Sequence, residues 1–128
     1  MENLADHGGV GIIAFPSGGM LHADDLVKTL QTMNEKKMYK ELVFYMEACE
    51  SGSMFENLPT DINVYATTAA NAKESSWGWY CGGGGGPPPL VHGKNLGVCL
   101  RDEFSVKWME DTDRADETTE TLSKQFDT

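Results

Sequence analysis

Apolar residues in this chain gather in short runs that polar or glycine-rich turns separate. Leu42–Met46 is a continuous apolar run, typical of a strand that is buried on both faces of a sheet. Ile62–Thr67 is rich in β-branched residues and predicts another strand. Val10–Phe15 predicts a third, and Ala23–Tyr39 has apolar residues at the spacing of an amphipathic helix.

The order of these elements predicts their topology. A strand, a helix and a second strand in succession favour a parallel pair joined by a right-handed crossover, here Val10–Phe15 beside Leu42–Met46. We therefore expect an α/β fold with a mostly parallel sheet. In open sheets of this kind, ligands bind at the carboxyl ends of the strands.

The second half of the chain shows less periodicity. Gly82–Gly86 is followed by Pro87–Pro89, and such a segment buries no core, so residues 82–98 are predicted to form a flexible, exposed loop. Order resumes at Phe104–Met109, and Glu117–Phe126 predicts a helix with an acidic start.

Charge and length narrow the possible functions. The chain has 128 residues, enough for one domain, and a net charge of −10. The absence of a basic stripe argues against nucleic acid, and the acidity argues against an anionic membrane surface. The charge suits an acidic compartment, although on charge alone plain solubility is the favoured explanation. No stretch is long enough to span a bilayer, and the first residues do not resemble a signal peptide.

Cys49 is the first candidate for chemistry. It follows the central strand and precedes a Ser-Gly-Ser turn, so we expect it at the rim of the sheet. An isolated cysteine is often a small buried hydrophobe. A catalytic cysteine needs a base that lies close in space, and His7 in the upstream Asp-His-Gly-Gly turn is a candidate.

The other two cysteines leave two interpretations open. Cys81 and Cys99 flank the glycine- and proline-rich segment, so a disulfide between them would close its ends. Two free thiols are the alternative, which a cytosolic chain would favour. No pair of histidines or cysteines has the spacing of metal ligands, so neither a metal nor another cofactor is predicted.

Several uninterrupted strings resemble one family. Leu42–Met54 (LVFYMEACESGSM), Asn63–Asn71 (NVYATTAAN), Glu74–Gly78 (ESSWG) and Trp108–Asp113 (WMEDTD) resemble the legumains, asparaginyl endopeptidases among the caspase-like cysteine peptidases. The resemblance implies a caspase-like three-layer sandwich with a mostly parallel sheet, incomplete at the N-terminus. Residues 1–128 would then be part of a legumain-like catalytic domain.

The resemblance also implies roles for individual residues. Cys49 would be the nucleophile, His7 the general base, and the backbone N–H groups of Gly8 and Cys49 the oxyanion hole. An asparagine side chain offers an acceptor and two donors, so its pocket needs fixed polar partners. The residues matching that pocket and its surroundings are Glu47, Ser75, Ser76, Trp77 and Asp102, and plant-type legumains carry a disulfide where Cys81 and Cys99 stand.

These roles define the expected function. We expect a cysteine endopeptidase that cleaves after asparagine, or after aspartate at low pH, and that ligates peptides when an amine resolves the acyl-enzyme. Its partners would be proteins with exposed asparagine and an inhibitory prodomain, and its location the lysosome or vacuole. The alternative is a catalytically inactive fragment or a binding-only relative. Composition alone would make Asp102 a solvated loop carboxylate.

Overall fold

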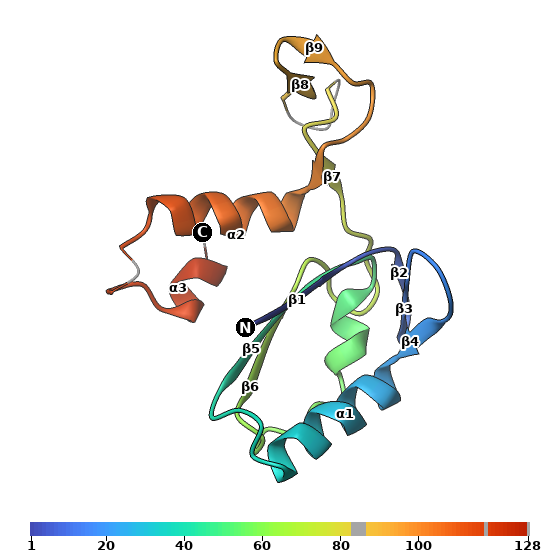
Figure 1. Cartoon of the computed structure of the whole chain (residues 1–128), viewed down its shortest axis with the longest axis vertical. Coiled ribbons are helices and arrows are strands. Elements are labelled where there is room, and N and C mark those ends of the chain that lie inside the picture. Colours follow the sequence, from blue (N-terminus) through green and yellow to red (C-terminus); the bar gives the residue numbers. More distant parts are fainter. Residues whose placement is uncertain (83–86, 117, 128) are drawn as a thin grey trace. The chain divides into compact units, whose positions relative to one another are not determined.

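The computed structural model describes residues 1–82, 87–116 and 118–127 (Figure 1). The chain divides into two compact units, Met1–Ser76 and Trp77–Thr128, which are described separately. In the described part of the chain, no helix has the length and apolar character needed to cross a membrane.

A three-stranded parallel sheet forms the centre of the first unit. Its strands are β1 (Glu2–Ala5), β5 (Leu42–Glu47) and β6 (Val64–Thr68), in the order β1-β5-β6. β5 pairs in parallel with both neighbours, and nearly all of its side chains are buried. The continuous apolar run follows from this central position. The predicted α/β class with a parallel sheet is confirmed.

The prediction of Val10–Phe15 as the parallel neighbour of the central strand is wrong. That neighbour is β1, while β2 (Gly8–Gly9), β3 (Ile12–Ala14) and β4 (Met20–His22) form a separate antiparallel sheet. Two tight turns fold this segment back on itself. They contain Gly11 and Gly18, whose φ angles of 72° and 110° are left-handed values that glycine adopts readily.

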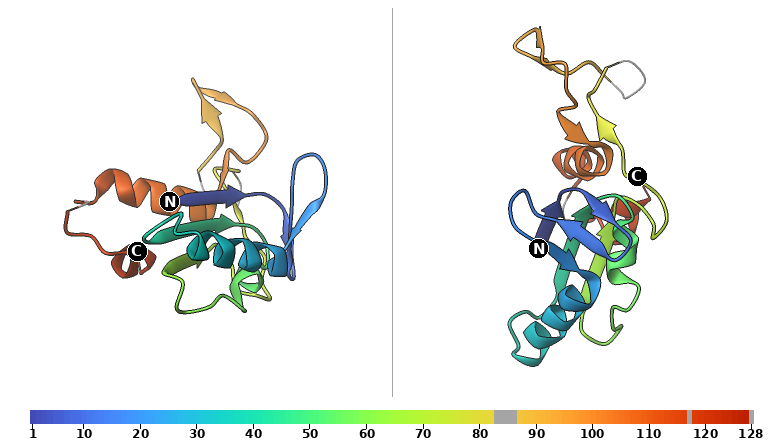
Figure 2. Two further views of the ribbon diagram at one scale, coloured as in Figure 1. Left: turned by 60° about the horizontal axis from the view of Figure 1, so that its bottom comes forward. Right: turned by 90° about the vertical axis from the view of Figure 1, so that its right-hand side faces the viewer.

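Helix α1 (Ala23–Glu35) begins where the sequence predicts and ends earlier than the predicted Tyr39. The chain leaves the helix at Lys37, which has a φ of 56°. Figure 2 shows α1 running along one face of the sheet. Leu26 and Leu30 of the helix share a buried core with Phe44 and Met46 of β5. This packing fixes the helix on the sheet, while its acidic first turn stays exposed.

The second unit is built on two short antiparallel strands and a helix. β7 (Gly78–Trp79) pairs with β10 (Arg101–Asp102), which leads directly into α2 (Glu103–Arg114). Between them, β8 (Leu90–Val91) and β9 (Lys94–Asn95) form a small hairpin. The predicted loop 82–98 therefore contains regular structure, whereas residues 83–86 lie outside the described residues.

The last helix is shorter than predicted. α3 (Leu122–Phe126) begins well after the predicted start at position 117, which itself lies outside the described residues. The Thr121 hydroxyl accepts a hydrogen bond from the Lys124 N–H (3.2 Å) and so caps the helix at this point. The Gln125 side chain donates to Thr112 Oγ1 (3.1 Å) and connects α3 with α2.

Candidate active site

The register of the parallel sheet brings the two predicted catalytic residues to the same end of two neighbouring strands. Ala5, the last residue of β1, pairs with Glu47, the last residue of β5. The Asp6 N–H then donates to the Glu47 carbonyl (3.1 Å), so the two segments remain adjacent beyond the ends of the strands. His7 and Cys49 each follow this last pair by the same number of residues. They therefore leave the sheet side by side at its carboxyl end.

Gly8 lies against the backbone of the cysteine turn. A Cβ at this position would stand 2.9 Å from the Ala48 Cβ and would overlap the Cys49 carbonyl oxygen. Both contacts are closer than side chains tolerate, so only glycine fits between the His7 turn and Cys49. The turn that carries His7 is held in place on its other side, because the Ala14 N–H donates to the His7 carbonyl (2.8 Å).

The buried hydroxyl of Ser53 connects the hairpin after His7 with the turn that carries Cys49. Ser53 Oγ donates to the Glu50 carbonyl (2.6 Å) and accepts from the Gly11 N–H (2.7 Å). Gly11 belongs to the hairpin that follows His7, and Glu50 directly follows Cys49. Glu50 has a φ of 50°, a left-handed conformation that is uncommon outside glycine and turns the chain sharply after the cysteine.

The loop after β6 supports the cysteine turn from the other side. The Glu50 N–H donates to the Glu74 carbonyl (2.7 Å), and the Gly52 N–H donates to the Ala70 carbonyl (2.9 Å). A Cβ on Gly52 would lie 2.9 Å from the Ala72 nitrogen, so these segments are in direct backbone contact. The same loop places Ser76 Oγ 3.8 Å from Cys49 Sγ, within hydrogen-bonding distance for sulfur.

The predicted substrate-binding residues are divided between the two units. Glu47 and Ser76 lie at the cysteine turn of the first unit, where Glu47 is only 1% exposed, and Ser75 is exposed. Trp77 and Asp102 belong to the second unit and are both exposed. There the Trp77 carbonyl accepts from the N–H of the residue after Asp102 (2.8 Å).

Cys81 and Cys99 are joined by a disulfide bond, and Cys49 is a free, half-buried thiol. The bond packs against the β7–β10 strand pair. A Cβ on Gly78 would lie 2.9 Å from Cys99 Sγ and 3.2 Å from Cys81 Sγ. Since Gly78 pairs with Asp102 across this ladder, the disulfide lies directly beside the strand that carries Asp102.

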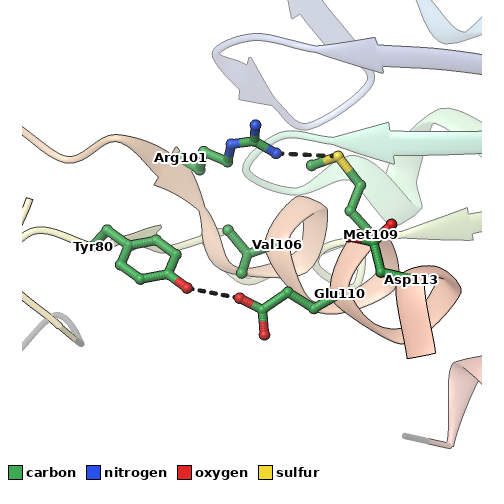
Figure 3. Close-up of a pocket in the computed structure, with 6 residues that line it drawn as sticks. All are labelled: Tyr80, Arg101, Val106, Met109, Glu110 and Asp113. Atoms are coloured by element: carbon green, nitrogen blue, oxygen red, sulfur yellow. Dashed lines mark hydrogen bonds between the residues drawn. The ribbon is translucent and has the colours of Figure 1, made fainter. Parts of the chain in front are cut away.

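The second unit also has a cavity of about 190 Å³ that the sequence did not suggest (Figure 3). Tyr80 and Glu110 face each other across it, with the Tyr80 hydroxyl donating to Glu110 Oε1 (2.7 Å). This hydrogen bond, followed by the nearby Arg114 charge, lowers the pKa of Glu110. The same bond is the main reason that the pKa of Tyr80 is raised. Within the described ranges, no cluster of three or more histidine, cysteine or carboxylate side chains is arranged to hold a metal ion.

Comparison with known proteins decides the family. Residues 2–128 match the model of the peptidase C13 family. The chain belongs to this family. It is 50% identical over 123 residues to the vacuolar-processing enzyme delta-isozyme of Arabidopsis thaliana, covering 95% of this chain and 26% of that protein. It is 53% identical over 123 residues to legumain of Mus musculus, covering 96% of this chain and 26% of that protein. The resemblance to legumains is thus confirmed, and the chain spans about a quarter of the length of these relatives.

The supporting residues of this peptidase C13 chain were not identified from the sequence. Gly52 and Ser53 were assigned only to a turn, yet they hold the cysteine turn against the hairpin and against the loop after β6. The Ser-Gly-Ser string was the available signal, because small residues permit close backbone approach and hydroxyls satisfy turn backbone groups.

Proposed function

We propose that this chain carries the catalytic pair of a cysteine endopeptidase that cleaves after asparagine. Cys49 is the nucleophile and His7 the general base in this proposal. The observation that supports it most strongly is the β1–β5 register, which places both residues directly beyond the Ala5–Glu47 pair at one sheet edge. A nucleophile and a base from distant parts of the sequence are thereby brought to the rim where α/β sheets bind ligands.

The proposed reaction proceeds through an acyl-enzyme. The Cys49 thiolate attacks the carbonyl carbon of the scissile bond, and protonated His7 gives its proton to the leaving amine as the C–N bond breaks. Water then attacks the thioester, losing a proton to His7, and the acid product leaves Cys49. The N–H groups of Gly8 and Cys49 are the proposed donors to the oxyanion. When a peptide amine replaces water in the second step, the product is a ligated peptide.

Asparagine preference is proposed to come from acidic and hydroxyl side chains. The amide N–H₂ of asparagine needs acceptors, a role for which the family resemblance supports Glu47 and Asp102. Ser75, Ser76 and Trp77 are the other residues that match this specificity by resemblance. Polar groups fixed around a bound side chain disfavour substrates that would leave those groups unpaired. The names of the plant relatives support a vacuolar or lysosomal location for the protein, where the medium is acidic.

Cleavage of paired fluorogenic peptides tests the proposal. At about pH 5, below the ordinary pKa of histidine, the chain should cleave a peptide with asparagine before the reporter and leave a glutamine peptide intact. Cys49→Ala and His7→Ala should each abolish cleavage, and an asparagine-based electrophile should label the wild type at Cys49 alone. Cleavage that survives Cys49→Ala would refute the mechanism, whereas equal cleavage of both peptides would refute the specificity. Labelling without any cleavage would favour a binding-only relative.

A further inference from the structure

The contact between Cys49 and Ser76 joins parts of the chain that lie far apart in the sequence. Cys49 Sγ and Ser76 Oγ are 3.8 Å apart, and either atom has a hydrogen to donate when the thiol is neutral. Both side chains are half-buried, so solvent competes less for the contact than it does at an exposed site.

The backbone fixes this contact on both sides. The residue after Cys49 donates its N–H to the Glu74 carbonyl (2.7 Å), only two positions before Ser76. The side chain of Glu74 in turn accepts from the Asn71 N–H (2.7 Å), which closes the loop that presents Ser76. A Cβ on Gly52 would lie within 3.0 Å of backbone atoms of this loop, so the two segments approach each other closely.

Ionisation of the thiol makes the contact directional. A thiolate has no hydrogen, so Ser76 must then be the donor, and a hydrogen bond to a charged group is stronger than one to a neutral group. Such a bond favours the charged form. The other ionisable side chains on the segments around Cys49 are mostly acidic, which disfavours a second negative charge there. The acidic ones are Asp6, Glu47, Glu50 and Glu74, and the basic ones are His7 and Lys73.

We propose that Ser76 stabilises the Cys49 thiolate by donating its hydroxyl hydrogen to the sulfur, and so sets the fraction of the nucleophile that is reactive. This role rests on the proposed function, in which Cys49 is the nucleophile. It differs from contact with the substrate side chain, because it acts before any substrate binds. The Ser76 hydrogen bond thereby offsets part of the unfavourable effect that the surrounding carboxylates have on the Cys49 thiolate.

The rate at which iodoacetamide alkylates Cys49 measures the reactive fraction of its thiol directly. The other two cysteines are disulfide-bonded, so Cys49 is the thiol available for reaction. The rate constant is measured from pH 4 to 10 for the wild type, Ser76→Thr and Ser76→Val. Thr and Val have nearly the same shape and differ in the hydroxyl group. We expect Ser76→Thr to follow the wild type. Ser76→Val should react about tenfold more slowly near pH 5.5, with its profile displaced upward by about one pH unit.

Controls separate this effect from general disturbance of the loop. Thr68→Val removes a hydroxyl that donates to the Ala70 carbonyl in the same loop (3.0 Å) and should leave the alkylation profile unchanged. At high pH, where the thiol is fully ionised in every variant, the rates should converge if the cysteine remains equally accessible. Superimposable profiles for Ser76→Thr and Ser76→Val would overturn the proposal, as would an equal displacement in Thr68→Val.

The measurement is independent of peptide cleavage. Iodoacetamide needs neither the oxyanion hole nor an asparagine pocket, so a chain that cleaves no peptide still gives an alkylation profile. A displaced profile without asparagine cleavage would support the Ser76 contact and refute the peptidase proposal. Asparagine cleavage together with superimposable alkylation profiles would support the peptidase proposal and refute the role of Ser76.

Discussion

Replacing Gly8 with alanine tests how closely the His7 turn is packed against the turn that carries Cys49. The new methyl carbon would lie 2.9 Å from the Ala48 Cβ and would overlap the Cys49 carbonyl oxygen. Carbon atoms in favourable contact are about 3.5 to 4.0 Å apart, so the Ala48 contact alone requires a movement of at least about 0.6 Å. Because both neighbours belong to the cysteine turn, the whole turn must move relative to His7.

A displacement of this size is large for catalysis. Misplacement of reacting groups by about 1 Å reduces rates by about a hundredfold. We therefore expect Gly8→Ala to lower kcat/KM for the asparagine peptide by about a hundredfold or more. Overpacking of a well-packed site costs about 1–3 kcal/mol of folding free energy, so the melting temperature should also fall. Circular dichroism at the assay temperature identifies any loss due to unfolding alone.

Gly9→Ala is the matched control, since it makes the same change one residue later. Its virtual Cβ has Ile12 Cγ1 as nearest atom at 3.4 Å, an ordinary contact. This variant should fold and cleave like the wild type. If Gly8→Ala is folded and retains the activity of Gly9→Ala, the close packing of the His7 turn against Cys49 is not needed for catalysis, and our reasoning on the site geometry is wrong.

Two further predictions concern the second unit. The Tyr80 hydrogen bond lowers the pKa of Glu110 below its ordinary 4.5. The stabilisation that this bond gives the folded state is therefore complete above pH 4.5, and it is lost as the pH falls through the lowered pKa. In urea titrations, the free energy of unfolding should therefore fall less between pH 6 and pH 3 for Tyr80→Phe than for the wild type. The same dependence of this free energy on pH in both proteins would contradict the prediction. Reducing the Cys81–Cys99 bond, which spans 18 residues, should destabilise the unit by about 3 kcal/mol. In a Cys49→Ala background, amide exchange in β7 and β10 should then accelerate, and unchanged exchange would show that the bond does not support these strands.

Strong hydrophobic patterns predicted the core of the first unit. The run Leu42–Met46 and the β-branched segment Ile62–Thr67 correspond to β5 and β6, because buried parallel strands require apolar residues on both faces. The start of α1 was predicted from its first turn. Its end was not, since Met38 fits the helical period but is 63% exposed, beyond the left-handed residue Lys37.

Weakly patterned strands were missed. β1 is an edge strand with mostly exposed residues, so Glu2–Ala5 carries no periodic signal, and its position depends on pairing with β5. The β8–β9 hairpin was hidden in a segment dominated by glycine and proline. Its turn residues, His92 and Gly93, have φ angles of 49° and 77°, which fit the two-residue hairpin turns that a glycine there favours.

The contacts that support the candidate site could not be predicted from the sequence. Cys49 follows a strongly predicted strand, so its place at the rim of the sheet could be inferred. The bridge through Ser53 and the contact of Ser76 with Cys49 depend on three separate turns meeting in space. No local pattern encodes such a meeting, and the family resemblance carried only the identity of the residues.

The pairing of Ala5 with Glu47 has a consequence for protein engineering. Transplanting the His7 and Cys49 loops onto another scaffold would require two adjacent parallel strands that end level with each other. Inserting a single amino acid within either strand would offset the two ends by a full residue and turn one side chain toward the opposite face. Strand alignment, more than loop sequence, is therefore the specification that a designer would have to reproduce.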